Sequence, residues 1–186
     1  MKKAKLDIIS ILGENDAIKD GHFELPCGLH IQSYVNTSLI MQYPSLAAKV
    51  AAALADLFNK KVDVVFAATV ENAIIAQEVA RVKKARAVFA ITENNIMKLK
   101  GGMVIRQREN VLVVDNVTMT GRKVREATAL AALFGANIVG IAVIVDRSES
   151  GSIGNFPLRS LLSYPLDTYE PENCPMCKAK IKLTKI

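Results

Sequence analysis

Several features that define common protein classes are missing from this sequence, and each absence excludes something. There is no tryptophan, and aromatic residues make up only 5% of the chain. The chain therefore lacks the stacking side chains of a single-stranded nucleic-acid platform, and we do not expect a nucleic-acid partner. The three cysteines are an odd number, which argues against a disulfide framework. No charge-free apolar stretch reaches about 18 residues, so we expect no membrane span.

The first residues also lack the pattern of a targeting peptide. Met1 to Leu6 is rich in lysine, but Asp7, Glu14 and Asp16 interrupt the apolar run that a signal peptide needs. We therefore expect a cytoplasmic protein.

The chain does have enough apolar residues to fold. Hydrophobic residues make up 51% of its 186 residues, which fits a single domain over 1–186. The formal net charge of +6 favours anionic partners such as phosphorylated metabolites. Much of this excess lies near the two ends, which also fits ordinary solvated tails: Lys2, Lys3, Lys5, Lys178, Lys180, Lys182 and Lys185.

The hydrophobic pattern predicts alternating strands and helices after a short N-terminal unit. We expect a helix from about Leu6 that stops before Asp20, a hairpin of strands 23–25 and 31–35, and a helix that begins at Pro44. The predicted later strands are 63–67, 87–91, 111–114 and 138–145, with helices at 72–82 and 124–134, a C-cap at Gly135 and a loop over 92–102. Such alternation implies a parallel sheet with helices on both sides and ligands at the carboxyl ends of the strands.

The segment 111–124 is the most informative for chemistry. Its apolar strand ends in Asp115, and a loop with Thr118, Thr120 and Gly121 leads into a helix. Backbone N–H groups at a helix start form an anion site, and Asp115 could accept hydrogen bonds from ribose hydroxyls. The same residues also fit a simple turn with a helix cap, so the pattern alone leaves both interpretations open.

Segment 111–124 resembles the phosphoribosyl diphosphate signature of type I phosphoribosyltransferases. In that signature a hydrophobic strand runs into two acids, two hydrophobes and Thr-Thr-Gly-Gly-Ser. Other segments are similar to the orotate branch of this family. Segment 21–30 is similar to its N-terminal hood, and 42–44 with the following Ala-rich helix is similar to the segment that comes after the hood. Residues 146–147 end the last strand as in the family, and 170–177 is similar to a C-terminal element of one subfamily. The resemblance covers nearly the whole chain in order.

The resemblance implies an α/β fold with a type I phosphoribosyltransferase-like parallel sheet flanked by helices and a small N-terminal hood. The hood would comprise 20–42 plus the C-terminal segment, and the core about 43–150. The resemblance also implies a homodimer that pairs through the hood and nearby helices, and phosphoribosyl diphosphate or a nucleotide as ligand, with Mg²⁺ if the protein is active.

The same resemblance assigns roles to residues. Catalysis would fall to Asp115 and Asn116, with Lys98 and Lys100 on the mobile loop. The phosphate-binding residues would be Thr118, Met119, Thr120, Gly121, Arg122 and Lys123. The diphosphate loop would be Ala68, Thr69, Val70, Glu71 and Asn72.

The sequence departs from the family pattern at several of these positions. Asn116 replaces the second acid, and Thr-Thr-Gly-Gly-Ser has become Met-Thr-Gly-Arg-Lys over 119–123. The diphosphate loop has lost its glycines and gained Glu71, which repels a diphosphate. Ile91-Thr92 replaces the Glu-Arg or Glu-Lys pair that opens the mobile loop, and the final Pro-Gly-Ser-Arg is absent. Losing one positioned charge typically costs about 10²–10³ in rate.

We therefore expect an orotate phosphoribosyltransferase-like protein that binds a phosphoribosyl compound or nucleotide, with transfer activity weak or lost. Arg122 and Lys123 favour anion binding without turnover. One alternative is an active orotate-type enzyme of pyrimidine nucleotide synthesis. The other is a nucleotide-sensing regulator that binds nucleic acid through a basic surface.

Cys174 and Cys177 have the spacing of half a zinc site, and they are the candidate metal ligands. A structural site needs four ligands. Cys27 could be a third only if the fold brings it near, and His22 and His30 are the only histidines. A redox or dimer-shared pair and an inert turn are the alternatives, and the histidines equally fit packing at strand ends. After the last strand, Asp146-Arg147 could contact a ligand or form an ordinary ion pair.

Overall fold

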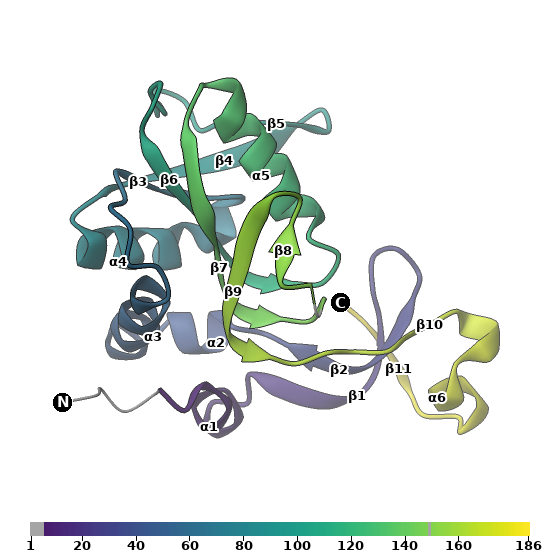
Figure 1. Cartoon of the computed structure of the whole chain (residues 1–186). Helices are drawn as coiled ribbons and strands as arrows, with labels where there is room; N and C mark the ends of the chain where they lie inside the picture. The colour runs from purple at the N-terminus through teal and green to yellow at the C-terminus, as the bar shows by residue number, and fades with distance from the viewer. Residues whose placement is uncertain (1–5, 149) are drawn as a thin grey trace.

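The computed structural model describes residues 6–148 and 150–186, which form a larger core sheet and a smaller hood sheet (Figure 1). The core sheet has the strand order β5-β4-β3-β6-β7-β9-β8. Its five inner strands are parallel: β3 (Val64–Ala67), β4 (Arg86–Glu93), β6 (Asn110–Thr118), β7 (Asn137–Asp146) and β9 (Phe156–Ser163). The edge strands β5 (Ile96–Leu99) and β8 (Ser152–Ile153) are antiparallel to their neighbours. The expected α/β class with a mostly parallel sheet is thereby confirmed.

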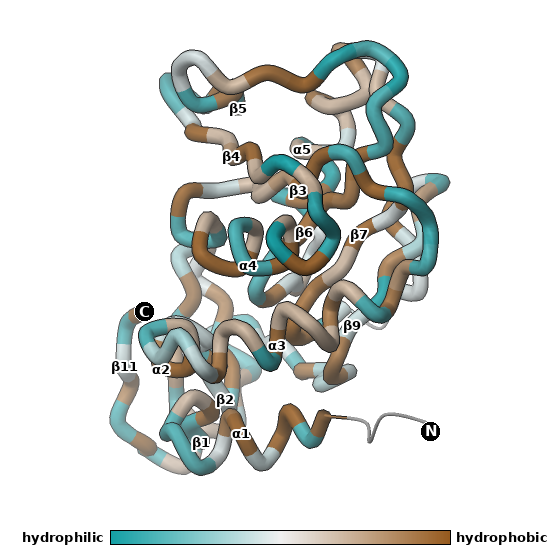
Figure 2. The backbone as a smooth tube through the Cα atoms, turned by 90° about the vertical axis from the view of Figure 1, so that its left-hand side faces the viewer, coloured by the Kyte–Doolittle hydropathy of each residue, from teal (hydrophilic) through white to brown (hydrophobic). Residues whose placement is uncertain are grey.

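Helices cover both faces of the core sheet, which explains why its central strands are apolar without interruption. The helices α3 (Pro44–Asp56) and α4 (Ala73–Lys83) lie on one face and α5 (Arg122–Leu133) on the other (Figure 1). Along β6, Leu112 and Val114 pack toward α3 and α4, and Val111 and Val113 pack toward α5. All four are fully buried. In Figure 2 the hydrophobic colour recurs along β4 and β7, and the hydrophilic colour gathers in the outer loops.

The hood contains segments from both ends of the described chain. The strands β1 (Ile18–Glu24) and β2 (His30–Val35) form an antiparallel hairpin after helix α1 (Ile8–Glu14). On one side β10 (Thr168–Tyr169) pairs with β2, and on the other β11 (Leu183–Lys185) pairs with β1. Between them lie η2 (Pro171–Asn173) and α6 (Pro175–Lys178). The short helix α2 (Ser38–Met41) connects the hood to α3.

Arg147 joins the core to the hood. It follows β7, is buried, and donates hydrogen bonds to the carbonyl oxygen and the hydroxyl of Ser33 on β2, at 3.0 and 2.9 Å. Its guanidinium also lies 5.3 Å from the ring centroid of Tyr164. Burial lowers the pKa of Arg147 from its ordinary value. Arg147 therefore fastens the end of β7 to the hood, and the neighbouring Asp146 caps its own turn by accepting from Ser148.

Four details differ from the sequence-based expectations. The first helix ends at Glu14, because Asp16 adopts a left-handed φ of 52° and the chain then enters β1. The predicted loop 92–102 contains the β4–β5 hairpin, whose turn residues Asn94 and Asn95 have φ values of 51° and 60°. The core sheet continues beyond residue 150 through β8 and β9. Finally, β6 extends to Thr118, so Asp115 and Asn116 lie on a strand. No helix in the described ranges is long and apolar enough to cross a membrane.

Candidate functional site

Asp115 marks the centre of the site, near the carboxyl end of β6. Its side chain is buried, and its Oδ1 accepts hydrogen bonds from the Asn72 amide at 2.5 Å and from the Asn116 backbone N–H at 2.8 Å. Burial raises the pKa of Asp115 from 3.8 to about 6, although the two hydrogen bonds and the positive charge of Lys123 oppose the shift. A carboxylate retained in such a place can accept hydrogen bonds from ligand hydroxyls.

Asn116 is the next residue and is half-buried. Its backbone N–H is used by Asp115, but its side-chain Oδ1 is buried and has no hydrogen-bond partner among the described residues. A buried polar atom without a partner costs about 1–3 kcal/mol. The end of β6 thus contains one carboxylate and one unsatisfied amide oxygen, and Asn116, unlike Asp115, does not line the two cavities described below.

The loop between β6 and α5 has the geometry of an anion site. Gly121 is the N-cap of α5 with a φ of 70°, and it supplies no side chain to cap the first turn. The backbone N–H of Arg122 donates to the Thr120 hydroxyl at 3.4 Å. The other backbone N–H groups in the first turn of α5 can reach an external acceptor. A Cβ at Gly121 would lie 2.6 Å from Cδ1 at the tip of the Ile153 side chain, which would have to move, but it is the positive φ that favours glycine here. Nearby, the Arg122 side chain is exposed and paired with Glu126 at 3.1 Å.

A cavity of about 530 Å³ opens in front of this loop. Asp115, Val117 and the loop residues Thr118 to Lys123 line one side of it, and the hood turn Leu25-Pro26-Cys27 lines the other. In Figure 1 the turn between β1 and β2 reaches up from the hood toward the core. The hood turn is a part of the site that the sequence did not reveal, because nothing in its residues predicts which loop it faces. We refer to this space as the loop cavity.

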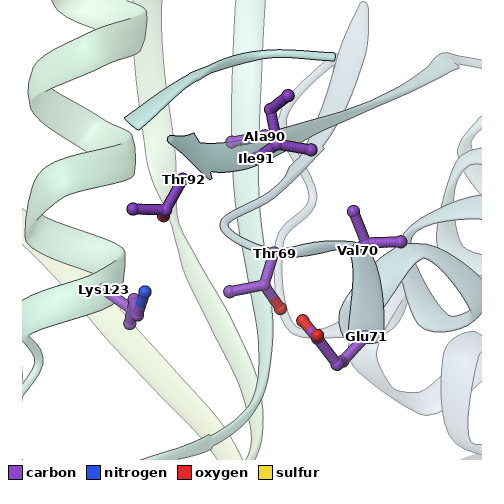
Figure 3. A pocket seen from close by; sticks show the side chains of 7 residues that line it. All are labelled: Thr69, Val70, Glu71, Ala90, Ile91, Thr92 and Lys123. Carbon is purple, nitrogen blue, oxygen red and sulfur yellow. The ribbon is translucent and has the colours of Figure 1, made fainter. Parts of the chain in front are cut away.

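A second cavity of about 310 Å³ lies beside the first (Figure 3). Its lining residues are Thr69, Val70, Glu71, Ala90, Ile91, Thr92 and Lys123. Lys123 lines both spaces. The carboxylate of Glu71 lies against the Thr69 side chain, with Lys123 facing them from α5 (Figure 3). A hydrogen bond from Thr69, a backbone hydrogen bond and the charge of Lys123 together lower the pKa of Glu71 below its usual value. We call this space the Glu71 cavity.

The structure brings together some of the predicted site residues and leaves others apart. Asp115, Thr118 to Lys123 and the diphosphate-loop residues Thr69, Val70 and Glu71 line the two cavities, and Asn72 holds Asp115. Ala68 is fully buried beneath them. Lys98 lies on the β5 hairpin, where it pairs with Glu93 at 2.5 Å, and neither Lys98 nor Lys100 lines the cavities.

The three cysteines lie at two different sites. Cys27 lines the loop cavity, so the fold does not bring it to Cys174 and Cys177 as a third metal ligand. Those two cysteines instead lie in the hood with both histidines. Sequence spacing identified half of this group, and only the tertiary fold supplies the rest.

The fold resembles that of solved phosphoribosyltransferases. An orotate phosphoribosyltransferase from Aeropyrum pernix superposes with a TM-score of 0.69 at 19% identity, covering 83% of this chain and 92% of that one. An adenine phosphoribosyltransferase from Rhodothermus marinus gives a TM-score of 0.67 at 16% identity over 84% and 98% of the two chains. The protein therefore has the type I phosphoribosyltransferase fold.

Sequence relatives narrow this class. The orotate phosphoribosyltransferase of Thermoanaerobacter sp. is 40% identical over 185 residues, 99% of this chain and 96% of that protein. The enzyme of the same name from Caldicellulosiruptor saccharolyticus is 37% identical over 179 residues, 95% and 93% of the two chains. The chain belongs to the orotate phosphoribosyltransferase family. No family model matches it, which is consistent with the substituted signature residues.

Proposed function

We propose that this protein binds a phosphoribosyl compound or nucleotide in the loop cavity and transfers the phosphoribosyl group to orotate weakly or not at all. The binding part of the proposal rests on Asp115 and the loop Thr118–Lys123, which line one cavity at the carboxyl end of β6. A phosphate at the start of α5 would accept from backbone N–H groups, and the ribose hydroxyls would lie toward Asp115. Two cations, Arg122 and Lys123, add attraction for the anion.

The position of Glu71 is the strongest argument against efficient transfer. In this family the reaction expels a diphosphate, which carries negative charge as it leaves. Glu71 lines the Glu71 cavity together with Thr92 and Lys123, and its lowered pKa keeps it ionised at neutral pH. The charge of Lys123, the cation that lines the same cavity, is accompanied there by this carboxylate. A leaving diphosphate would meet a fixed negative charge where electrostatic stabilisation is needed.

The residues at this site also fit magnesium poorly. Mg²⁺ at phosphate sites is held by one or two carboxylates together with the substrate phosphates. The end of β6 supplies a single carboxylate, Asp115, whose pKa is about 6 and whose Oδ1 already accepts two hydrogen bonds. The neighbouring position is an amide, Asn116.

Two measurements on the purified protein test the proposal. Isothermal titration with phosphoribosyl diphosphate, orotate and orotidine monophosphate should detect binding of the phosphoribosyl ligands. A direct assay with Mg²⁺, phosphoribosyl diphosphate and orotate should show turnover far below the median enzyme value of about 10 s⁻¹. Turnover near that median would refute the proposed loss of activity, and an absence of binding by every phosphoribosyl ligand would refute the proposed site.

A further inference from the structure

Four side chains that can bind a metal meet in the hood, away from the two cavities. His22 on β1, His30 on β2, Cys174 and Cys177 each offer one ligand atom, and all four atoms lie within 4.8 Å of one another. His22, His30 and Cys174 are buried, with exposed fractions of 3%, 4% and 0%. Cys177 reaches the group from α6 and is exposed to solvent. The four ligand atoms come from two parts of the chain that are far apart in sequence, the β1–β2 hairpin and residues 174–177.

The separations between these atoms fit a tetrahedral zinc ion. Typical Zn–N and Zn–S bonds give tetrahedron edges of about 3.3 Å between two nitrogens and about 3.6 Å between nitrogen and sulfur. Here His22 Nε2 lies 3.5 Å from Cys174 Sγ and 3.7 Å from Cys177 Sγ, and His30 Nδ1 lies 3.4 Å from Cys177 Sγ. The two imidazole nitrogens are 2.9 Å apart, so a bound ion would separate them slightly.

The surrounding hydrogen bonds orient the ligand atoms toward a common centre. The other ring nitrogen of His22, Nδ1, lies 2.9 Å from the carbonyl oxygen of Ile181. A carbonyl only accepts, so Nδ1 carries the proton and the Nε2 lone pair is free for a metal. The backbone N–H of Cys177 donates to Cys174 Sγ at 3.4 Å, which fixes the position of this sulfur. Both contacts are of the kind that supports ligands in metal sites.

We propose that His22, His30, Cys174 and Cys177 form a structural site for one Zn²⁺ ion. Four protein ligands close the coordination sphere, which is the arrangement of a structural zinc site and leaves no position for a substrate. Two thiolates and two neutral imidazoles also make the ion and its ligands electrically neutral, which suits a largely buried place. Binding releases a proton from each thiol that is protonated before the metal arrives.

The site would fasten the C-terminal segment to the hood hairpin. The parallel pairing of β11 with β1 covers His22 to Glu24 but is short, with three residue pairs. The exposed residues of β11 bury little apolar surface to strengthen it. The hood turn Leu25-Pro26-Cys27 follows β1 directly and lines the loop cavity. Zinc would thus set the position of this turn opposite the phosphate loop.

Metal analysis of the whole purified protein tests this site without any activity assay. Protein made in zinc-supplemented medium and purified under reducing conditions, without chelators or a histidine tag, should contain one zinc per chain by mass spectrometry of the elements. Replacement by Co²⁺ should produce the visible absorption of tetrahedral cobalt together with thiolate charge-transfer bands. Removing zinc with a strong chelator should lower the melting temperature, and Zn²⁺ should restore it.

Variants identify the ligands. Cys177→Ser changes an exposed side chain and should lose the bound zinc and the cobalt thiolate signal, whereas Cys27→Ser, the matched control, should keep both. Wild-type protein without bound zinc and without a cobalt thiolate spectrum would overturn the proposal. A mass 2 Da below that of the reduced chain after zinc-supplemented purification, which indicates a Cys174–Cys177 disulfide, would overturn it too. Equal loss of metal in Cys27→Ser and Cys177→Ser would show that the assigned ligands are wrong.

Discussion

The side-chain amide of Asn72 donates to Oδ1 of Asp115 across 2.5 Å, and this bond joins the loop after β3 to the end of β6. Both residues are buried. The contact accounts for two features that the sequence showed separately, an asparagine in a loop without glycines and an acid at a strand end. It also leaves Oδ2 of Asp115 as the carboxylate oxygen available to a ligand.

Asp115 should reduce the stability of the folded protein at neutral pH. Its pKa is raised from 3.8 to about 6 in the folded state, so the buried charge costs about 3 kcal/mol above pH 6. The cost shrinks as the pH falls below 6, because the folded state then binds a proton, and it is gone below about 3.8, where the carboxyl is protonated in both states. Asp115→Asn keeps an oxygen for both hydrogen bonds and removes the charge. Its free energy of unfolding should exceed that of the wild type at pH 7, and the gain should shrink at pH 5.

Denaturant unfolding at a series of pH values measures this difference. Asp63→Asn is a control with the opposite sign, because hydrogen bonding from the Asn110 backbone and the Lys61 side chain lowers the pKa of Asp63. That variant should be less stable than the wild type at pH 7, with the deficit shrinking in acid. A gain for Asp115→Asn that does not depend on pH would contradict the assigned cause.

Asn116→Asp alone should not restore orotate transfer. It would place a second carboxylate beside Asp115, and two adjacent acids hold their protons more tightly than one. Glu71 and Thr92 would still fail to stabilise the leaving diphosphate. The steady-state rate of Asn116→Asp should stay close to that of the wild type and of Asn59→Asp, a control that adds the same charge on an exposed residue. A rate near the median enzyme value of about 10 s⁻¹ would contradict this prediction.

Arg122→Ala should weaken the binding of phosphoribosyl ligands about tenfold, the effect of losing one charge-assisted hydrogen bond. Arg122 lines the loop cavity, whereas Arg125, one turn further along α5, is exposed and does not line it. Arg125→Ala therefore removes the same charge from the same helix and should bind nearly normally. Titration calorimetry of both variants compares them. Unchanged affinity in Arg122→Ala would mean that the phosphate lies elsewhere.

Glu71→Gln should strengthen the binding of phosphoribosyl diphosphate and of diphosphate itself. The change removes a negative charge from the Glu71 cavity, which Lys123 also lines. The gain should be about tenfold for diphosphate at low salt and smaller at high salt, because screening weakens such interactions. Glu14→Gln on α1 is the control: it removes the same charge from a residue that lines neither cavity, and it should leave the affinity for diphosphate unchanged. Weaker diphosphate binding in Glu71→Gln would show that Glu71 has a positive role.

The protein should be a homodimer at micromolar concentration, as light scattering can show. The smooth face expected of the Ala-rich helix is partly used within the chain, because Ala47, Ala51 and Ala55 of α3 are buried in the core. Tyr43, at the start of that helix, is nonetheless 49% exposed. Tyr43→Glu should shift the mass toward the monomer, and Leu133→Glu at the end of α5 should not. A monomeric wild type would contradict the prediction.

The core sheet could be predicted because its signals are local. The segments that became β3, β6 and β7 are apolar without interruption, and Pro44 marks the start of α3. The strand β9 was not predicted, because Pro157 and Arg159 interrupt its apolar pattern. It forms a strand through its parallel pairing with β7, which is a tertiary contact. The strand β11 is exposed along its length, so no hydrophobic periodicity indicates it.

The site was predictable to the same extent. The residues of one β–α turn are adjacent in sequence, and Asp115 with Thr118 to Lys123 could be found there. The partners that come from elsewhere could not, since no spacing rule places Cys27 opposite Thr120 or His22 beside Cys174. These pairs lie together because the hood and the core pack as they do. Sequence spacing identifies a chelating pair, and tertiary structure completes it.

The hood sheet places an early hairpin between two late strands, in the order β10-β2-β1-β11. During synthesis on the ribosome, β1 and β2 therefore emerge long before the strands that flank them. The whole core sheet, through Ser163, is made in between. The core can settle while the hood hairpin still has both edges open, and the hood closes only after β11 has left the exit tunnel. A nascent chain stalled just after β9 would carry the phosphate loop, but the hood turn facing it would still lack the support of β10 and β11.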